Sequence, residues 1–217
     1  MICSGRVVCN GAVASLGDSA DPDTDEILVD GCPIPQEQKP VYIMLNKPRG
    51  YVTTLSDEKG RKSVQRLVAG CAARVYPVGR LDMDSDGLLL LTNDGDITNR
   101  LTHPKHLVDR TYRVSVSGYS ENAFRRLSKP MQLDGYLLQI PKLQLIVADT
   151  KTQKATFEMT IHEGRNRQIR RMCAIAGMRV TRLTRVSHGN VSLGDLPTGK
   201  WRYLTETEIQ SLMPDIS

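Results

Sequence analysis

The sequence has 217 residues, enough for one domain of ordinary size and a small additional segment. Its five cysteines are scattered and form no C-x-x-C pair, which argues against a disulfide framework and against a cysteine zinc site. No apolar run approaches the roughly 20 residues of a membrane span, and the first residues lack the apolar stretch of a signal peptide. We therefore expect a soluble, cytoplasmic protein.

The charge is distributed unevenly along the chain. Residues 1–36 hold one arginine and six acidic residues, so their net charge is −5. The remaining residues hold 28 basic and 18 acidic side chains, and 28 − 18 = +10, a surplus that favours a polyanionic partner. Residues 163–185 alone carry seven arginines, the residue type suited to bidentate contacts with phosphate. A solvated basic surface is the alternative interpretation.

The first 36 residues contain short apolar segments next to turn dipeptides. Residues 5–11, 12–15 and 26–31 predict three short strands, with Asn-Gly and Asp-Gly as the turns. Residues 31–40 are rich in proline and polar side chains and predict a linker, so we place a domain boundary near Gln36. Residues 1–36 offer too little apolar surface to fold alone.

Residues 37–217 alternate between strand and helix patterns. In its first half we predict strands at 41–46, 87–93 and 110–118, a short helix at 63–70, and a helix from Asp96 to Pro104. A helix capped by Ser120, a hairpin within 131–161 and a helix from near Asn166 are predicted next. Further strands up to Tyr203 and a final helix, with Thr205 and Glu208 in capping-box spacing, complete the prediction. No regular β-α-β repeat connects them. The predicted fold class is α+β, with a mixed, largely antiparallel central sheet and flanking helices.

Three aspartates, Asp82, Asp84 and Asp86, stand at every second position before Gly87. This spacing matches the start of an EF-hand loop, but position 12 of that loop is Asn93 and a leucine-rich strand replaces the exiting helix, so we reject calcium. Turn chemistry accounts for the second and third aspartates. The first lies in a loop between two predicted strands, where functional side chains often lie.

An ionised carboxylate at position 82 requires a cation nearby, because three close carboxylates raise one another's pKa. Arg80 and the arginines of residues 163–185 could supply that cation. The predicted helix after Asn166 has four apolar residues on one face: Ile169, Met172, Cys173 and Ala176. Arg167 and Arg171 fall on the opposite face, toward solvent or RNA, whereas Arg170 falls at the border and can reach an inner carboxylate.

Five motifs occur in an order that resembles a known family. They are "LNKPRGYVTT" at 45–54, "YPVGRLDMDSDGLLLLTNDG" at 76–95, "RTYRV" at 110–114, "EGRNRQIRRM" at 163–172 and "LGDLPTGKWRYLT" at 193–205. From about Pro40 to the C-terminus the chain resembles the ribosomal pseudouridine synthases of the group named after small-subunit synthase A and large-subunit synthases B, E and F. Residues 4–35 resemble the second half of an S4 RNA-binding domain, which predicts domains at 1–36 and 37–217.

The resemblance implies three catalytic residues. Asp82 resembles the essential aspartate, which acts on uridine either as a nucleophile or as the base of a glycal route. Tyr112 resembles the tyrosine that packs against the uracil and is a candidate proton acceptor. Arg170 resembles the basic partner of the aspartate, in agreement with its border position on the helix.

The resemblance also implies residues that bind the RNA. Arg80 resembles the arginine that fills the gap left by the flipped base, and Lys47 resembles a residue that contacts the RNA backbone. Arg167 and Arg171 are predicted to face the RNA. The implied reaction isomerises a uridine in ribosomal RNA, more in keeping with the large subunit than the small one, by a monomer that needs no metal, nucleotide or other cofactor. The alternative is a catalytically silent RNA-binding or ribosome-assembly factor on the same fold.

Overall fold

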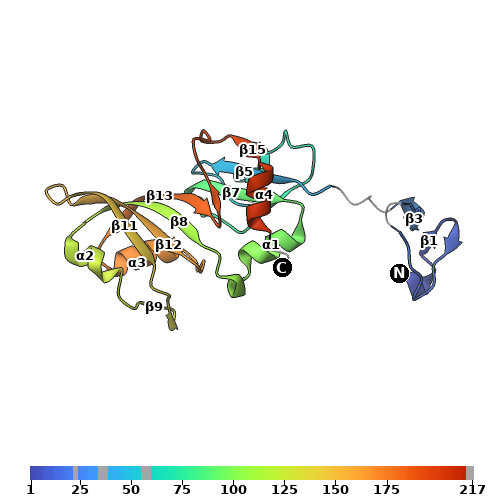
Figure 1. Ribbon diagram of the computed structural model, residues 1–217, viewed down its shortest axis with the longest axis horizontal. Coiled ribbons are helices and arrows are strands. Elements are labelled where there is room, and N and C mark those ends of the chain that lie inside the picture. The colour runs from blue at the N-terminus through green and yellow to red at the C-terminus, as the bar shows by residue number, and fades with distance from the viewer. Residues whose placement is uncertain (22–23, 34–38, 55–59, 214–217) are drawn as a thin grey trace. The chain divides into compact units, whose positions relative to one another are not determined.

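The computed structural model describes residues 1–21, 24–33, 39–54 and 60–213. The chain divides into two compact units, Met1–Pro40 and Val41–Ser217 (Figure 1). The boundary predicted at Gln36 lies outside the described residues. Within those residues, no helix is both long enough and apolar enough to cross a membrane.

The small unit contains a four-stranded antiparallel sheet in the order β2-β1-β3-β4, after a short 3-10 helix at Ile2–Ser4. The strands are β1 (Val7–Cys9), β2 (Ala12–Val13), β3 (Ile27–Val29) and β4 (Cys32–Pro33). Both hairpin turns, Asn10-Gly11 and Asp30-Gly31, have positive φ at both residues, as a tight two-residue turn requires. The three predicted strands are present and β4 is an addition. Among the described residues of this unit, none is buried.

The large unit is built on a nine-stranded sheet. Its strands are β5 (Tyr42–Lys47), β6 (Tyr76–Pro77), β7 (Asp86–Thr92), β8 (Arg110–Ser117), β11 (Lys142–Asp149), β12 (Lys154–Ile161), β13 (Arg179–His188), β14 (Val191–Ser192) and β15 (Trp201–Tyr203). The main order is β11-β12-β8-β13-β7-β5-β15, with β14 beside β13 and β6 beside β7. The β7–β13 pair is parallel and the other pairs described are antiparallel, which confirms the predicted α+β class.

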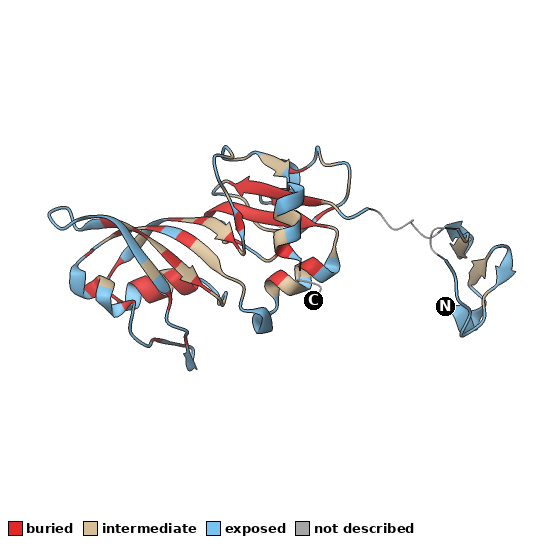
Figure 2. Cartoon of the chain, viewed as in Figure 1, coloured by how far each residue is buried: buried red, intermediate tan, exposed pale blue. Residues whose placement is uncertain are grey.

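Apolar side chains cover both faces of the sheet where β5 and β7 lie. The helices are α1 (Gly95–Thr102), α2 (Glu121–Arg126), α3 (Gln168–Ile175) and α4 (Glu206–Leu212), with 3-10 turns η2 (Val64–Leu67) and η3 (Pro104–His106). On one face, Ile43 and Leu89 belong to a core that includes Val64 of η2 and extends along the sheet to α2 and α3. On the other face, Met44 and Leu90 share a second core with α1 and α4. Every residue of β5 and β7 is therefore buried, which Figure 2 shows as continuous red.

The helix ends agree with the predictions except at α1. Ser120 caps α2 by accepting the backbone N–H of Ala123, and the predicted capping box at the start of α4 is present. The cap of α1 is Asp94, whose carboxylate accepts the backbone N–H groups of residues 96 and 97. The prediction of Asp96 was wrong because the helix begins two residues earlier. The helix predicted at 63–70 is the single 3-10 turn η2.

The parallel pairing of β7 with β13 depends on Gly87. This residue has φ +103° and lies opposite Arg185, and a Cβ built on it would come within 2.3 Å of the Arg185 carbonyl oxygen. Only glycine fits such a close approach of two backbones. The loop that carries Asp82 leads directly into this contact, so the pairing sets where that loop ends.

Candidate active site

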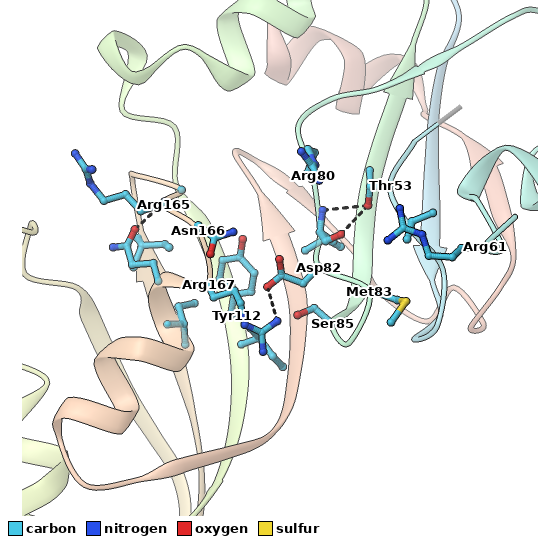
Figure 3. Close-up of a pocket in the computed structure, with 17 residues that line it drawn as sticks. Thr53, Arg61, Arg80, Asp82, Met83, Ser85, Tyr112, Arg165, Asn166 and Arg167 are labelled. Carbon is cyan, nitrogen blue, oxygen red and sulfur yellow. Dashed lines mark hydrogen bonds and ion pairs between the residues drawn. The ribbon is translucent and has the colours of Figure 1, made fainter. Parts of the chain in front are cut away.

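A cavity of about 470 Å³ opens beside the loop that precedes β7. Its walls come from residues 52–53, 80–83, 85 and 164–169, together with Tyr112 of β8, Arg61, Ile161 and Leu183. Figure 3 shows the Asp82 carboxylate directed into this space, with Tyr112 and Arg167 beside it. The cavity therefore brings together residues as far apart in the chain as Val52 and Leu183, as pairing across the sheet allows.

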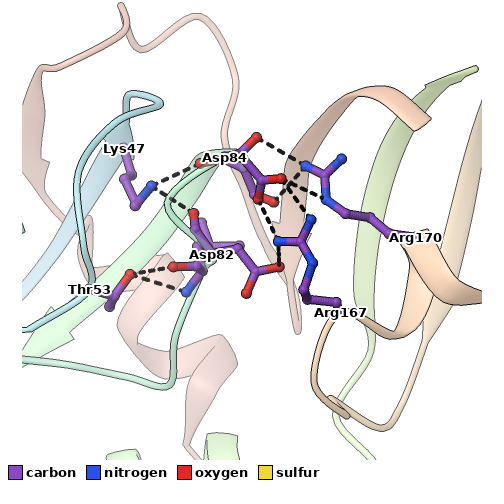
Figure 4. A network of polar contacts seen from close by, with 8 residues as sticks. Lys47, Thr53, Asp82, Asp84, Arg167 and Arg170 are labelled. Atoms are coloured by element: carbon purple, nitrogen blue, oxygen red, sulfur yellow. Dashed lines mark hydrogen bonds and ion pairs between the residues drawn. The ribbon is translucent and has the colours of Figure 1, made fainter. Parts of the chain in front are cut away.

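Lys47 supports the loop between Leu81 and Asp86 that carries Asp82, called the aspartate loop below. Its ammonium donates hydrogen bonds to the carbonyl oxygens of Pro48 (3.1 Å), Asp82 (3.1 Å) and Ser85 (2.8 Å), and the residue is fully buried (Figure 4). Burial lowers the pKa of this ammonium to about 8, while the charge of Asp86 opposes that shift. The prediction that Lys47 contacts the RNA backbone is therefore wrong. A lysine at the end of a fully buried strand has no path to solvent, so it satisfies carbonyls instead.

Two further contacts fix the same loop and were not anticipated from the sequence. The Thr53 hydroxyl donates to the Leu81 carbonyl oxygen at 2.7 Å and accepts from the Leu81 backbone N–H at 3.2 Å. The Gly50 N–H donates to the Met83 carbonyl oxygen at 2.7 Å. Segment 47–53 thus makes hydrogen bonds to residues on both sides of Asp82. The motif "LNKPRGYVTT" was visible in the sequence, but its role as a support was not.

Asp84 binds two arginines of the α3 segment. Its carboxylate accepts a bidentate pair of hydrogen bonds from Arg167, at 3.0 and 2.9 Å, and lies 3.4 Å from the Arg170 Nε. Arg170 also donates to the Asp84 carbonyl oxygen at 3.0 Å and to the Ser85 hydroxyl at 3.3 Å. The hydrogen bonds from Arg167 are the main reason that the pKa of Asp84 is lowered. Asp84 is therefore more than the turn residue that its sequence context predicts.

The cation nearest to the Asp82 carboxylate is Arg167, not Arg170. The Arg167 Nη1 lies 3.6 Å from the Asp82 Oδ2, whereas Arg170 forms its ion pair with Asp84. The predicted Asp82–Arg170 pair is corrected accordingly. The helical projection failed because Arg167 is the residue before the helix and adopts a left-handed conformation, with φ 50° and ψ 32°. Its side chain therefore turns toward the aspartate loop (Figure 4).

Tyr112 and Arg80 border the cavity at the predicted positions. Tyr112 is 9% exposed and lies on β8 between Met159 of β12 and Arg185 of β13. Strand neighbours on both sides restrict its ring to the cavity side of the sheet. Arg80 precedes the aspartate by two residues, so its exposed side chain lies at the mouth of the cavity.

Arg171 does not line the cavity. Its guanidinium donates two hydrogen bonds of 2.7 Å to the carboxylate of Asp134, which lies in the turn of a short hairpin. The guanidinium is thus held in an ion pair within the protein while its side chain stays 36% exposed, and contact of Arg171 with RNA stays a prediction. The predicted apolar stripe of α3 is confirmed, since its four residues are all buried in the core shared with α2.

The three aspartates of the motif do not converge on one point. Asp86 is buried and accepts from the Nε of Arg182 at 3.2 Å, Asp84 binds the arginines of α3, and Asp82 alone is directed into the cavity. Among the described residues, the cavity is thus lined by one carboxylate, an aromatic ring and several cationic side chains. Such a set can act on a planar, uncharged ring that is attached to an anionic chain.

Comparison with known proteins agrees with this geometry. Residues 41–175 match the RNA pseudouridylate synthase family. Ribosomal large subunit pseudouridine synthase B of Bacillus subtilis (strain 168) is 40% identical over 213 residues, which cover 98% of this chain and 87% of that protein. An uncharacterised RNA pseudouridine synthase of Aquifex aeolicus is 37% identical over 215 residues, covering 98% of this chain and 85% of that protein.

A solved structure of a pseudouridylate synthase superposes with a TM-score of 0.72 at 32% sequence identity, covering 98% of this chain and 90% of the other. The chain therefore belongs to the RNA pseudouridylate synthase family. The resemblance to the group that includes large-subunit synthase B, predicted from five motifs, is confirmed by the relatives.

Proposed function

We propose that this protein converts a uridine of ribosomal RNA, in the large subunit, into pseudouridine. The observation that carries the proposal concerns Asp82, the one carboxylate among the described residues that line a cavity of about 470 Å³, where it lies next to Tyr112 and the Arg167 guanidinium. The substrate is inferred from the names of several relatives, which are large-subunit pseudouridine synthases.

The reaction moves the uracil ring within one nucleotide. The bond from the ribose C1′ to the uracil N1 breaks, a bond from C1′ to C5 forms, the C5 proton leaves, and N1 gains a proton. We assign Asp82 to the step that starts at the ribose, either as a nucleophile at C1′ or as the base of a glycal route. Tyr112 would pack against the displaced ring and accept the C5 proton.

The uridine must leave its base stack before it can reach Asp82, at a cost of a few kcal/mol. The cavity is large enough for a uracil and its ribose, and Arg80 at its mouth would occupy the space that the base vacates. Cationic side chains along the rim would offset the cost of flipping by binding phosphates on either side. We assign Arg167 two roles, as the cation beside Asp82 and as part of that rim.

Arg170 acts in this proposal through Asp84, and Lys47 acts through the backbone of the aspartate loop. Both are positioning residues, since their polar atoms contact the loop and not the cavity. Asp84 fixes Arg167 at the correct distance from Asp82. The precision of this support matters because a displacement of about 1 Å at a catalytic group can lower the rate about 100-fold.

The test is conversion of uridine in a 23S ribosomal RNA transcript whose uridines carry tritium at C5. Release of the tritium measures the conversion. Wild type should release tritium from a single site, and Asp82→Asn should release none while it binds the transcript with unchanged affinity. Asn keeps the size of the side chain and removes its charge. Undiminished release by the variant would remove Asp82 from catalysis, and binding without release by the wild type would favour a silent RNA-binding factor.

A further inference from the structure

A short hairpin beside the cavity presents an aromatic ring to solvent. Its strands are β9 (Gln132–Leu133) and β10 (Tyr136–Leu137), joined by Asp134 and Gly135, which both have positive φ. This turn places Tyr136 at the tip, where the residue is 51% exposed. A ring with this exposure contributes little to the core.

The hairpin is held to the α3 segment at two places. Asp134 receives the bidentate ion pair from Arg171, and the Gln139 N–H donates to the Glu163 carboxylate at 3.1 Å. Glu163 also accepts from the Gln168 side chain at 3.0 Å, at the first residue of α3. These contacts fix the tip of the hairpin relative to residues 164–169, which form one wall of the cavity.

Arg165 connects the hairpin to the cavity. Its guanidinium carbon lies 3.4 Å from the centre of the Tyr136 ring, the contact of a guanidinium stacked on an aromatic face. Arg165 itself borders the cavity. Figure 3 shows that its side chain extends from the cavity wall away from Asp82, so the stacked pair lies outside the space that surrounds the carboxylate.

We propose that the guanidinium of Arg165, supported by Tyr136, is a stacking surface for the base of a nucleotide next to the target uridine. This inference rests on the proposed function. Unstacked bases of single-stranded RNA commonly bind to aromatic rings and to arginine planes. A uridine that enters the cavity leaves its neighbours at the rim, and the positive charges of Arg165 and Arg167 attract the phosphates that connect them.

Two substitutions separate stacking from charge. Arg165→Lys keeps the positive charge but removes the planar group, and Tyr136→Ala removes the ring beneath it. Tyr136→Phe keeps the ring and is the conservative control. Tyr203→Ala is the matched control elsewhere, because Tyr203 on β15 is 53% exposed and lies outside the cavity lining. None of the three sites is buried, so thermal unfolding should confirm that each of the four variants folds.

The probe is a single-stranded oligoadenylate RNA with one central uridine and the fluorescent base 2-aminopurine beside it. Wild type should bind this RNA and quench the fluorescence, because a stacked 2-aminopurine is dark. Arg165→Lys and Tyr136→Ala should bind about tenfold more weakly, the typical loss for one stacked base, and should quench less. Tyr136→Phe and Tyr203→Ala should behave as wild type. The slope of affinity against salt should not change in Arg165→Lys, since the charge is kept.

The binding experiment does not depend on catalysis, so it can fail separately from the proposed function. Equal affinity and equal quenching for wild type and Tyr136→Ala would overturn the stacking site, and so would full retention of both by Arg165→Lys. With the 23S ribosomal RNA transcript, the stacking site predicts that Tyr136→Ala raises KM about tenfold and leaves kcat unchanged. A transcript that wild type never converts would instead overturn the proposed function.

Discussion

The sheet of the small unit and the centre of the large sheet are both made of short apolar strands, yet only the second buries them. Among the described residues of strands β1 to β4, none is buried, whereas every residue of β5 and β7 is buried. The difference lies in what covers the strands. Apolar side chains from other parts of the large unit cover both faces of β5 and β7, so these strands are apolar at consecutive positions.

The comparison explains why the large unit can carry a precise site. A loop whose two ends are buried is held rigidly, because its ends cannot move without opening the core. The aspartate loop has such ends, at Leu81 and at Asp86. The hairpin turns of the small unit have good local geometry but no buried neighbours to hold them.

The largest expected effect on stability comes from replacing a glycine with positive φ in the large unit, compared with one in the small unit. Gly87→Ala would place a methyl group 2.3 Å from the Arg185 carbonyl oxygen, so the β7–β13 pairing must open. We expect destabilisation above about 4 kcal/mol, or no soluble protein. Gly31→Ala, at φ +76° with no heavy atom within 4 Å of an added Cβ, should leave the midpoint of the main urea unfolding transition unchanged. Similar midpoints for both variants would contradict the comparison.

Leucines of the two sheets test how much burial contributes. Leu89 of β7 is fully buried, and Leu89→Ala should lower the free energy of unfolding by about 3 kcal/mol through lost contacts and a cavity. Leu28 of β3 is only half-buried, and Leu28→Ala should cost less than about 1 kcal/mol. Urea unfolding followed by circular dichroism measures both. If Leu28→Ala lowers the free energy of unfolding as much as Leu89→Ala does, burial does not distinguish the two sheets.

Removal of the buried Lys47 ammonium should lower the stability less than the substitutions above, but it should lower the activity strongly. Lys47→Met keeps the length of the side chain and leaves three carbonyl oxygens without their donor, so the aspartate loop should relax and kcat should fall about 100-fold. The tritium-release assay measures it. An unchanged kcat would show that the loop does not need this support.

The same lysine predicts a dependence on pH. Because its pKa is about 8 in the folded protein and 10.5 ordinarily, the folded protein releases this proton at a lower pH than the unfolded chain does. The Lys47 contribution to the free energy of unfolding should therefore rise between about pH 8 and pH 10.5. Activity should fall around pH 8, where the folded protein loses this proton, since a neutral amine has one N–H fewer to donate. In Lys47→Met the stability should lack this rise.

The smallest effect is expected at the exposed cation of the small unit. Arg6 pairs with Asp30 across the N-terminal sheet, and both side chains are half-exposed. Exposed ion pairs of this kind contribute little because water and salt screen them. Arg6→Ala should leave kcat, KM and the unfolding midpoint as in wild type. A clear loss of RNA conversion by this variant would give the small unit a functional role that its charge does not suggest.

Local patterns in the sequence were sufficient for most of the fold. The strand pattern at 41–46, the cap at Ser120 and the capping box at Thr205 depend on neighbours within a few residues, so the order of amino acids determines them. The motif order also led to the family, and to Asp82 and Tyr112 as residues that border one cavity.

The partners of charged side chains were decided by the tertiary structure. Which arginine approaches Asp82 depends on the left-handed conformation of Arg167, and a helical projection assumes that this residue is helical. Likewise, the burial of Lys47 depends on the layers that cover β5, which lie far away in the sequence. An ion pair or a buried charge forms between segments that meet only after the sheet has assembled, and the chain order alone does not specify that distance.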